Sequence, residues 1–252
     1  MGGTRNQFQG EASSGFLNPA AIGAGSLPVL YADYFTTGGV SGFTGAAEIN
    51  PFSRLNLSFM GRRSEGGVAV YGMGIAGQLL SGAPDTYLNI GGAARLVNGL
   101  EKGQERCAVC GENGGSGAET GAFSAGVIFR PFPSFSLRYI GEWALDSGYH
   151  QLFEGSDYHR VGISFYFLPG LMISLEREFR EELTLDHFGF NLRTGLPLEI
   201  MTGYSNGSVS GGVRLAWKAI RASAVFSQDE GDGIRTRVSM EFSPELDGRR
   251  VE

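Results

Sequence analysis

Side chains alternate with a period of two through most of this chain. Residues 123–146 read FSAGVIFRPFPSFSLRYIGEWALD, in which Phe123, Ala125, Val127 and Phe129 stand at every second position. A helix needs a period near 3.6, whereas successive side chains of a strand point to opposite faces. The alternation therefore predicts strands that have one apolar face and one polar face.

Two all-β architectures can use such strands. In a soluble sandwich the apolar faces pack on each other, whereas in a transmembrane barrel they meet lipid and the polar faces line the lumen. The mean hydropathy of −0.06 does not separate the two, because half of each barrel strand is polar. No run approaches the ~20 continuous apolar residues of a membrane-spanning helix, so any crossing of a membrane would use strands.

Charges on the polar faces favour the barrel. Arginine and glutamate recur opposite the aromatic residues, which is too much charge for a sheet face that packs on protein. We expect these charges to pair with one another along the lumen wall rather than to mark a solute path. The residues predicted to face the lumen are Arg138, Glu142, Glu176, Arg193, Arg214 and Arg237.

The lengths of the connections point the same way. Short connections (RPFPS, FLPGL, TGLPL, WKAIR) alternate with longer polar ones (ALDSGYHQLFEGSDYH, REELTLD, SQDEGDG), and SNGS is a short member of the second set. Outer-membrane barrels have short periplasmic turns and longer extracellular loops, whereas a Greek-key sandwich has long connections at both ends. The sequence therefore predicts an all-β fold, an antiparallel up-and-down transmembrane β-barrel.

The pattern predicts about fourteen strands, an even number as in single-chain bacterial barrels. Twelve is the alternative. The glycine pairs 91–92 and 211–212 are interpreted as points of strand curvature. Nine strands are expected in the C-terminal half and five more at residues 27–35, 42–51, 54–62, 67–77 and 86–96. The expected organisation is an N-terminal periplasmic or plug segment (1–26), the barrel (27–243) and a C-terminal tail (244–252).

The segment before the first expected strand reads MGGT and then EASSGFLNPAAIG. It resembles the N-terminal segment of the FadL-type outer-membrane barrels and their PorV-like relatives, in which a Met-Gly-Gly stretch leads to Asn-Pro-Ala. Asn18, Pro19 and Ala20 match that tripeptide, and FRPFPSFSLRYIGEW, a strand closed by a Pro-aromatic corner, is also similar to this superfamily. The chain departs from FadL itself in being much shorter, with no room for a large hatch domain.

The resemblance implies a fourteen-stranded barrel in the bacterial outer membrane. It also implies that the N-terminal segment folds inward as a plug or gate, carried here by Asn18, Pro19, Ala20, Ala21 and Ile22. From the residues alone, Asn18 is expected to cap a short helix that has Pro19 at its first position. Because MGGTRNQF lacks the apolar stretch of a signal peptide, we expect the numbering to start at or near a mature or truncated end.

Cys107 and Cys110 are the only cysteines and lie in QERCAVCGENGGSGAETG, between two predicted strands. The strand count places this loop on the extracellular side, where an oxidising environment favours a local disulfide. Zinc is the alternative, since CxxCG is half of a zinc-ribbon pattern, but the chain has no second pair. Haem attachment would need a histidine where Gly111 stands.

Signatures of enzymes are absent from the sequence. It contains no GxSxG, P-loop, HExxH or dinucleotide-binding glycine pattern, so we assign no catalytic residue and expect no cofactor. His150, His159 and His187 lack metal-ligand spacing and are predicted to be surface residues. The formal net charge of −6 and the lack of a long basic run argue against nucleic acid as a partner.

Two functions follow from a non-enzymatic outer-membrane barrel. The first is transport of small hydrophobic molecules across the outer membrane, with the N-terminal segment as gate. The alternative is a structural anchor or adaptor subunit of an envelope protein assembly for secretion or surface display. Outer-membrane lipid is an expected partner in both; a small hydrophobic ligand belongs to the first and other envelope proteins belong to the second.

Overall fold

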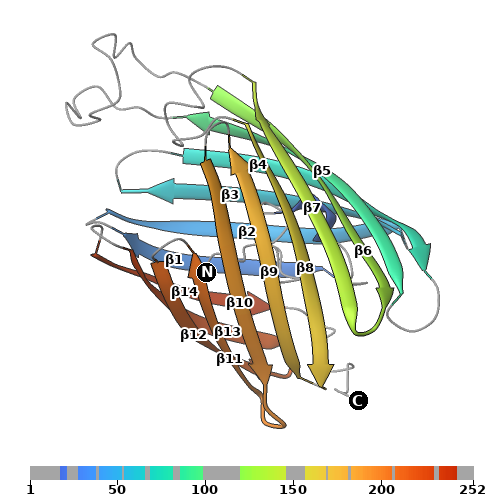
Figure 1. Cartoon of the computed structure of the whole chain (residues 1–252). Coiled ribbons are helices and arrows are strands. Elements are labelled where there is room, and N and C mark those ends of the chain that lie inside the picture. Colours follow the sequence, from blue (N-terminus) through green and yellow to red (C-terminus); the bar gives the residue numbers. More distant parts are fainter. Residues whose placement is uncertain are drawn as a thin grey trace.

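In the computed structural model, fourteen antiparallel strands form one closed barrel (Figure 1). Each strand pairs with its neighbours in sequence, so an up-and-down barrel of fourteen strands is confirmed and the alternative of twelve is wrong. The structure describes residues 18–21, 28–37, 40–52, 54–65, 69–81, 86–98, 120–145, 157–168, 170–180, 183–205, 208–229 and 233–242. The strands are β1 (Val29–Thr37), β2 (Val40–Phe52), β3 (Leu55–Ser64), β4 (Ala69–Ser81), β5 (Tyr87–Asn98), β6 (Thr120–Phe132), β7 (Phe135–Ala144), β8 (Tyr158–Leu168), β9 (Leu171–Arg180), β10 (Leu183–Arg193), β11 (Leu198–Ser205), β12 (Ser208–Trp217), β13 (Ile220–Asp229) and β14 (Gly233–Phe242).

The first and last strands close the sheet. β1 pairs with β14 from Leu30 opposite Phe242 to Thr36 opposite Thr236, and on its other side β1 pairs with β2. Figure 1 shows the result, with blue β1 beside red β14. Every described strand therefore has two hydrogen-bonded neighbours, which leaves no free sheet edge.

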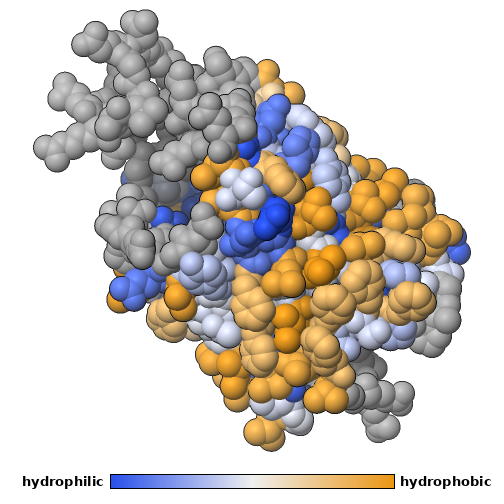
Figure 2. Space-filling view, viewed as in Figure 1, coloured by the Kyte–Doolittle hydropathy of each residue, from blue (hydrophilic) through white to orange (hydrophobic). Residues whose placement is uncertain are grey.

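The predicted alternation of faces determines which side chains point into the lumen and which point outward. Along β9, Leu175 and Phe179 are 46% and 44% exposed, whereas Glu176 and Glu178 between them are 3% and 0% exposed. Exposed apolar side chains occur on the outward face of all fourteen strands, and Figure 2 shows how they dominate much of one side of the wall. An apolar exterior of this extent around a polar interior is the surface pattern of a barrel that lies in lipid.

Helical structure is minor in the described part of the chain. It consists there of one 3₁₀ turn, η2 (Pro19–Ala21). No helix in the described ranges is long and apolar enough to span a bilayer.

The predicted alternation of short and long connections is only partly right. REELTLD was expected to be a loop, but β9 continues to Arg180 and β10 begins at Leu183. SQDEGDG likewise lies largely in β13 and β14. Charged residues can remain in strands here because they pair across the hairpin: Arg177 Nε lies 2.7 Å from Asp186 Oδ1 on the outer face.

The outward face of β12 gives a test of membrane insertion. Val213 and Val209 both point outward, Val213 near the middle of the strand and Val209 at its end. We expect Val213→Arg to lower the free energy of unfolding by about 2 to 4 kcal/mol and Val209→Arg by about 0 to 1, because the cost depends on depth in the bilayer. Urea unfolding in lipid vesicles measures both, and equal losses would contradict a lipid-facing β12.

Candidate functional site

The turn η2 lies inside the barrel, against the inner wall formed by β4, β5 and β6. Asn18, Pro19, Ala20 and Ala21 are all fully buried. Ala20 and Ala21 pack with Tyr87 of β5 and Ile128 of β6 in one apolar cluster. The segment that the sequence singled out as an N-terminal gate therefore lies within the lumen over residues 18–21, whereas Ile22 is outside the described residues.

Local sequence explains the shape of the turn. The backbone N–H of Ala20 donates to Asn18 Oδ1 at 3.0 Å, and that of Ala21 donates to the Asn18 carbonyl at 2.9 Å. Pro19 occupies the first helical position, where its missing N–H leaves no bond unmade. The predicted cap by Asn18 is confirmed.

Two glycines form the surface on which the turn sits. Gly91 and Gly126 are opposite each other on β5 and β6. A Cβ atom added at Gly126 would lie 2.0 Å from Asn18 Oδ1, and one added at Gly91 would lie 2.4 Å from the carbonyl carbon and oxygen of Pro19. Only glycine permits this approach. The sequence was interpreted as using Gly91 for strand curvature, and the structure shows that Gly91 also makes room for the turn. We call Gly91 and Gly126 the glycine seat.

Uncharged polar groups surround the glycine seat. Asn89 and Ser124 lie two residues from Gly91 and Gly126 on the same inner face, and both are 1% exposed. Within the described part of the chain, neither amide atom of Asn89, nor Ser124 Oγ, nor Asn18 Nδ2 has a hydrogen-bond partner. Buried polar groups are normally paired with protein, water or a ligand, so this part of the wall is a hydrogen-bonding surface.

Apolar side chains line another part of the interior. Val29, Tyr31 and Ala46 form one buried cluster on β1 and β2, and Met60 of β3 packs against it. Met60 also packs against a second cluster, formed by Val70, Val97 and Ala122 of β4, β5 and β6. The inner wall from β1 to β6 is thus partly apolar.

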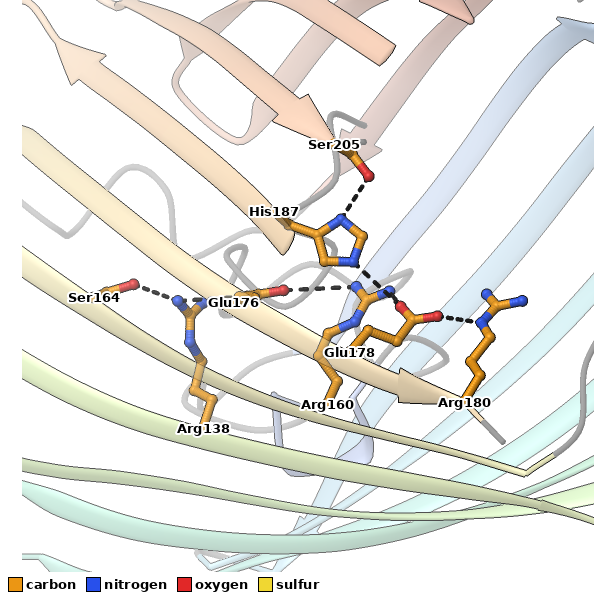
Figure 3. A network of polar contacts seen from close by, with 8 residues as sticks. All are labelled: Arg138, Arg160, Ser164, Glu176, Glu178, Arg180, His187 and Ser205. Atoms are coloured by element: carbon orange, nitrogen blue, oxygen red, sulfur yellow. Dashed lines mark hydrogen bonds and ion pairs between the residues drawn. The ribbon is translucent and has the colours of Figure 1, made fainter. Parts of the chain in front are cut away.

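The inner wall of β7, β8 and β9 carries a buried chain of charges (Figure 3). Arg138 Nη2 and Arg160 Nη1 each lie 3.6 Å from a carboxylate oxygen of Glu176. Arg160 also pairs with Glu178, which in turn pairs with Arg180. The two glutamates are almost completely buried, and burial of this kind is stable only where charges are paired.

His187 joins the same network from β10 (Figure 3). Its Nε2 lies 3.4 Å from Glu178 Oε2, and its Nδ1 lies 2.7 Å from Ser205 Oγ. The prediction that all three histidines are surface residues is wrong for His187, because it is opposite Glu176 in the sheet register and therefore points inward. His159 faces outward and bonds to the Tyr139 hydroxyl at 2.8 Å, and His150 is outside the described residues.

A second group of charges surrounds Glu199 of β11. Arg193 Nε and Arg214 Nη1 each lie 3.0 Å from a Glu199 oxygen, and Asn191 Nδ2 donates to the same carboxylate at 2.6 Å. Unlike the first network, this group reaches solvent, since the Arg193 side chain is 63% exposed.

The six charges predicted to face the lumen all lie on the inner wall, and each has an ionic partner. For Glu142 the partner is Arg95, at 2.7 Å, and for Arg237 it is Asp33. Sequence reasoning missed Arg95 and Asp33 because alternation is less regular in the N-terminal half. The signal available was their position in phase with buried neighbours such as Tyr31 and Val97.

Other predicted sites are not in the described residues or have no counterpart there. Cys107 and Cys110 lie outside the described residues, so their disulfide stays a prediction. Among the described residues, no group of three or more His, Cys, Asp or Glu side chains is arranged to hold a metal ion.

Solved structures with a similar fold are bacterial outer-membrane proteins. The toluene transporter TodX of Pseudomonas putida has a TM-score of 0.66 and 10% identity, over 97% of this chain and 96% of TodX. The Ralstonia pickettii toluene transporter TbuX has a TM-score of 0.61 and 12% identity, over 91% of this chain and 93% of TbuX. The Acinetobacter baumannii outer membrane protein Omp33 has a TM-score of 0.59 and 9% identity, over 86% of this chain and 98% of Omp33. No family model and no curated protein matches this chain, so the comparisons establish the barrel fold alone.

The buried charge network predicts that an ion pair on the inner wall contributes more to the free energy of unfolding than one on the outer face. We expect Glu178→Gln to lower the free energy of unfolding by about 3 to 5 kcal/mol, because the buried Arg160 loses the closer of its two glutamate partners and Arg180 loses one carboxylate partner. Asp186→Asn removes the exposed partner of Arg177, and we expect no measurable loss. Urea unfolding of the two variants in lipid vesicles makes the comparison, and similar losses would contradict the structural role of Glu178.

Proposed function

We propose that this protein is a bacterial outer-membrane barrel that transports small hydrophobic molecules, and that η2 is its gate. The observation that carries the proposal is the position of the turn: residues 18–21 are fully buried in the lumen, on a seat formed by two glycines. The inner wall thus accommodates this segment closely. We infer that the segment can also leave this surface and so open the lumen.

The contacts of the turn are suited to reversible release. Apart from its cap, the side chains that it buries are those of Pro19, Ala20 and Ala21, which are small. At about 25 cal/mol for each Å² of apolar surface, small side chains contribute only a few kcal/mol to docking. A difference of this size is within the range by which a ligand can shift a population between a docked and a released turn.

A hydrophobic cargo is supported by two features. The clusters around Met60 supply apolar inner surface on β1 to β6, next to the wall that holds the turn. TodX and TbuX, which share the fold, are toluene transporters, in line with the resemblance to FadL-type barrels stated from the N-terminal motif.

The anchor or adaptor function is the second candidate, favoured by the burial of the charged network. Glu176, Glu178 and Arg160 are at most 5% exposed and are paired with one another, an arrangement that needs no solute. A barrel whose inner charges serve only its own structure would present its rim and loops to other envelope proteins.

The glycine seat allows a test in the full chain. In planar lipid bilayers, we expect Gly126→Ala to increase conductance and to speed the uptake of a hydrophobic probe, because its Cβ would displace Asn18. Gly45→Ala is the matched control, since a Cβ at Gly45 meets nothing within 4 Å. If Gly126→Ala forms a stable barrel whose conductance equals that of Gly45→Ala, the gate proposal fails and the adaptor function gains support.

A further inference from the structure

We propose that the place occupied by η2 is also the binding site of the transported molecule, and that this site selects small neutral compounds with an apolar body and one hydroxyl or amide group. The inference rests on the proposed function, because the turn must leave the glycine seat before a ligand can take its place. It adds the chemical class of the ligand, namely the polar group by which the ligand differs from a plain hydrocarbon.

The side-chain amide of Asn89 carries the inference. Asn89 is the third residue of β5 and lies on the inner wall, where it is 1% exposed. Neither its Oδ1 nor its Nδ2 has a hydrogen-bond partner among the residues that the structure describes. A buried amide without partners costs free energy, and such groups in proteins are normally paired with protein, water or a ligand.

This amide lies beside the apolar contacts of the turn. Asn89 is opposite Ile128 in the register of β5 and β6, and Tyr87 lies two residues away on the same face of β5. Ala20 and Ala21 of the turn pack against Ile128 and Tyr87. Once the turn leaves, these two wall residues therefore form an apolar surface that borders the amide.

Ser124 is the other wall residue near the seat whose side chain lacks a hydrogen-bond partner in the described part of the chain. It is opposite Ala93, four residues beyond Asn89 on β5. At about 3.3 Å per residue, the two groups are roughly 13 Å apart along the strand, which is longer than a single substituted ring. A small ligand therefore reaches one of them, and the apolar neighbours favour Asn89.

Charged side chains that border this part of the wall already have partners. Arg138 of β7 is opposite Ile128, and its Nη2 lies 3.6 Å from Glu176 Oε1. Glu142, also on β7, lies 2.7 Å from Arg95 Nη1. A ligand is therefore not required to bring a charge to this site.

The unpartnered amide determines which group of a ligand fits. Nδ2 can only donate and Oδ1 can only accept, so a hydroxyl or amide group, which does both, can pair with either atom. A carboxylate has no proton to donate to Oδ1, and it would lose hydration that one amide does not replace. A hydrocarbon fits the apolar surface but leaves the amide unpaired. We therefore expect affinity to fall from the hydroxyl compound to the hydrocarbon and then to the carboxylate.

Binding of three matched compounds to the purified chain in detergent tests this order. p-Cresol, toluene and p-toluate share a methyl-substituted ring, to which p-cresol adds a hydroxyl and p-toluate a carboxylate. We expect p-cresol to bind about three- to tenfold more tightly than toluene, which corresponds to one neutral hydrogen bond, and p-toluate to bind most weakly. Isothermal titration calorimetry measures the three dissociation constants.

Two substitutions of Asn89 separate the hydrogen bond from the apolar contacts. We expect Asn89→Leu and Asn89→Ala to remove the advantage of p-cresol over toluene, because neither side chain can pair with the hydroxyl. Ser210→Ala is the matched control and should keep that advantage, since the buried Ser210 hydroxyl already donates to the Gly203 carbonyl at 3.3 Å. Partition of the compounds into detergent is the same for all variants, so a change in the ratio of affinities reports the site.

The outcomes separate the ligand class from the proposed function. A ratio that both Asn89 variants leave unchanged shows that the amide does not contact the ligand. A urea midpoint that both variants lower shows that the amide already has a partner such as buried water. Either result overturns the amide site, and a raised conductance of Gly126→Ala would still support the gate. If none of the three compounds binds to the unsubstituted barrel, the hydrophobic cargo and the amide site fail together.

Discussion

Backbone pairing between β1 and β14 closes the sheet, and this closure decides where every side chain of the barrel can go. With no free edge, each residue of a strand faces either the surroundings or the lumen, and the next residue faces the other side. The outward set is largely apolar, and the polar groups of the inward set must be satisfied internally. Arginine–glutamate pairs on the inner wall therefore satisfy charges that the closed fold buries, whatever their part in a transport path.

Different parts of the inner wall carry different kinds of residue, and this difference links the fold to the proposed function. On β5 and β6 the wall has two glycines, Gly91 and Gly126, which have no side chain. A turn of the chain can therefore lie directly on the backbone there. On β7 to β12 the wall carries buried arginine and glutamate side chains that are joined in ion pairs. The N-terminal turn and the ionic network thus lie on different parts of the wall, so substitutions at different residues can alter each of them separately.

Much of the fold could be predicted from sequence, because alternation is a local property that each strand displays by itself. The inward direction of Arg138 and the outward direction of Phe129 follow from it directly. The ends of two hairpins were misplaced because charged residues such as Asp186 were assigned to loops, whereas pairs across a hairpin keep them in strands. The role of Gly126 could not be predicted, since the glycine seat is defined by the turn that packs directly against it, and that turn is distant in sequence.

Amide hydrogen exchange can show whether residues 18–21 are docked on the inner wall of the barrel in solution. A three-residue turn has too few hydrogen bonds to protect itself in water, so protection of the Ala20 and Ala21 amides can come only from burial in the lumen. For the protein in lipid vesicles, we predict exchange at Ala20 and Ala21 that is slow compared with an unstructured peptide of the same sequence. Exchange at the rate of that peptide would contradict the docked turn, the gate and the function built on them.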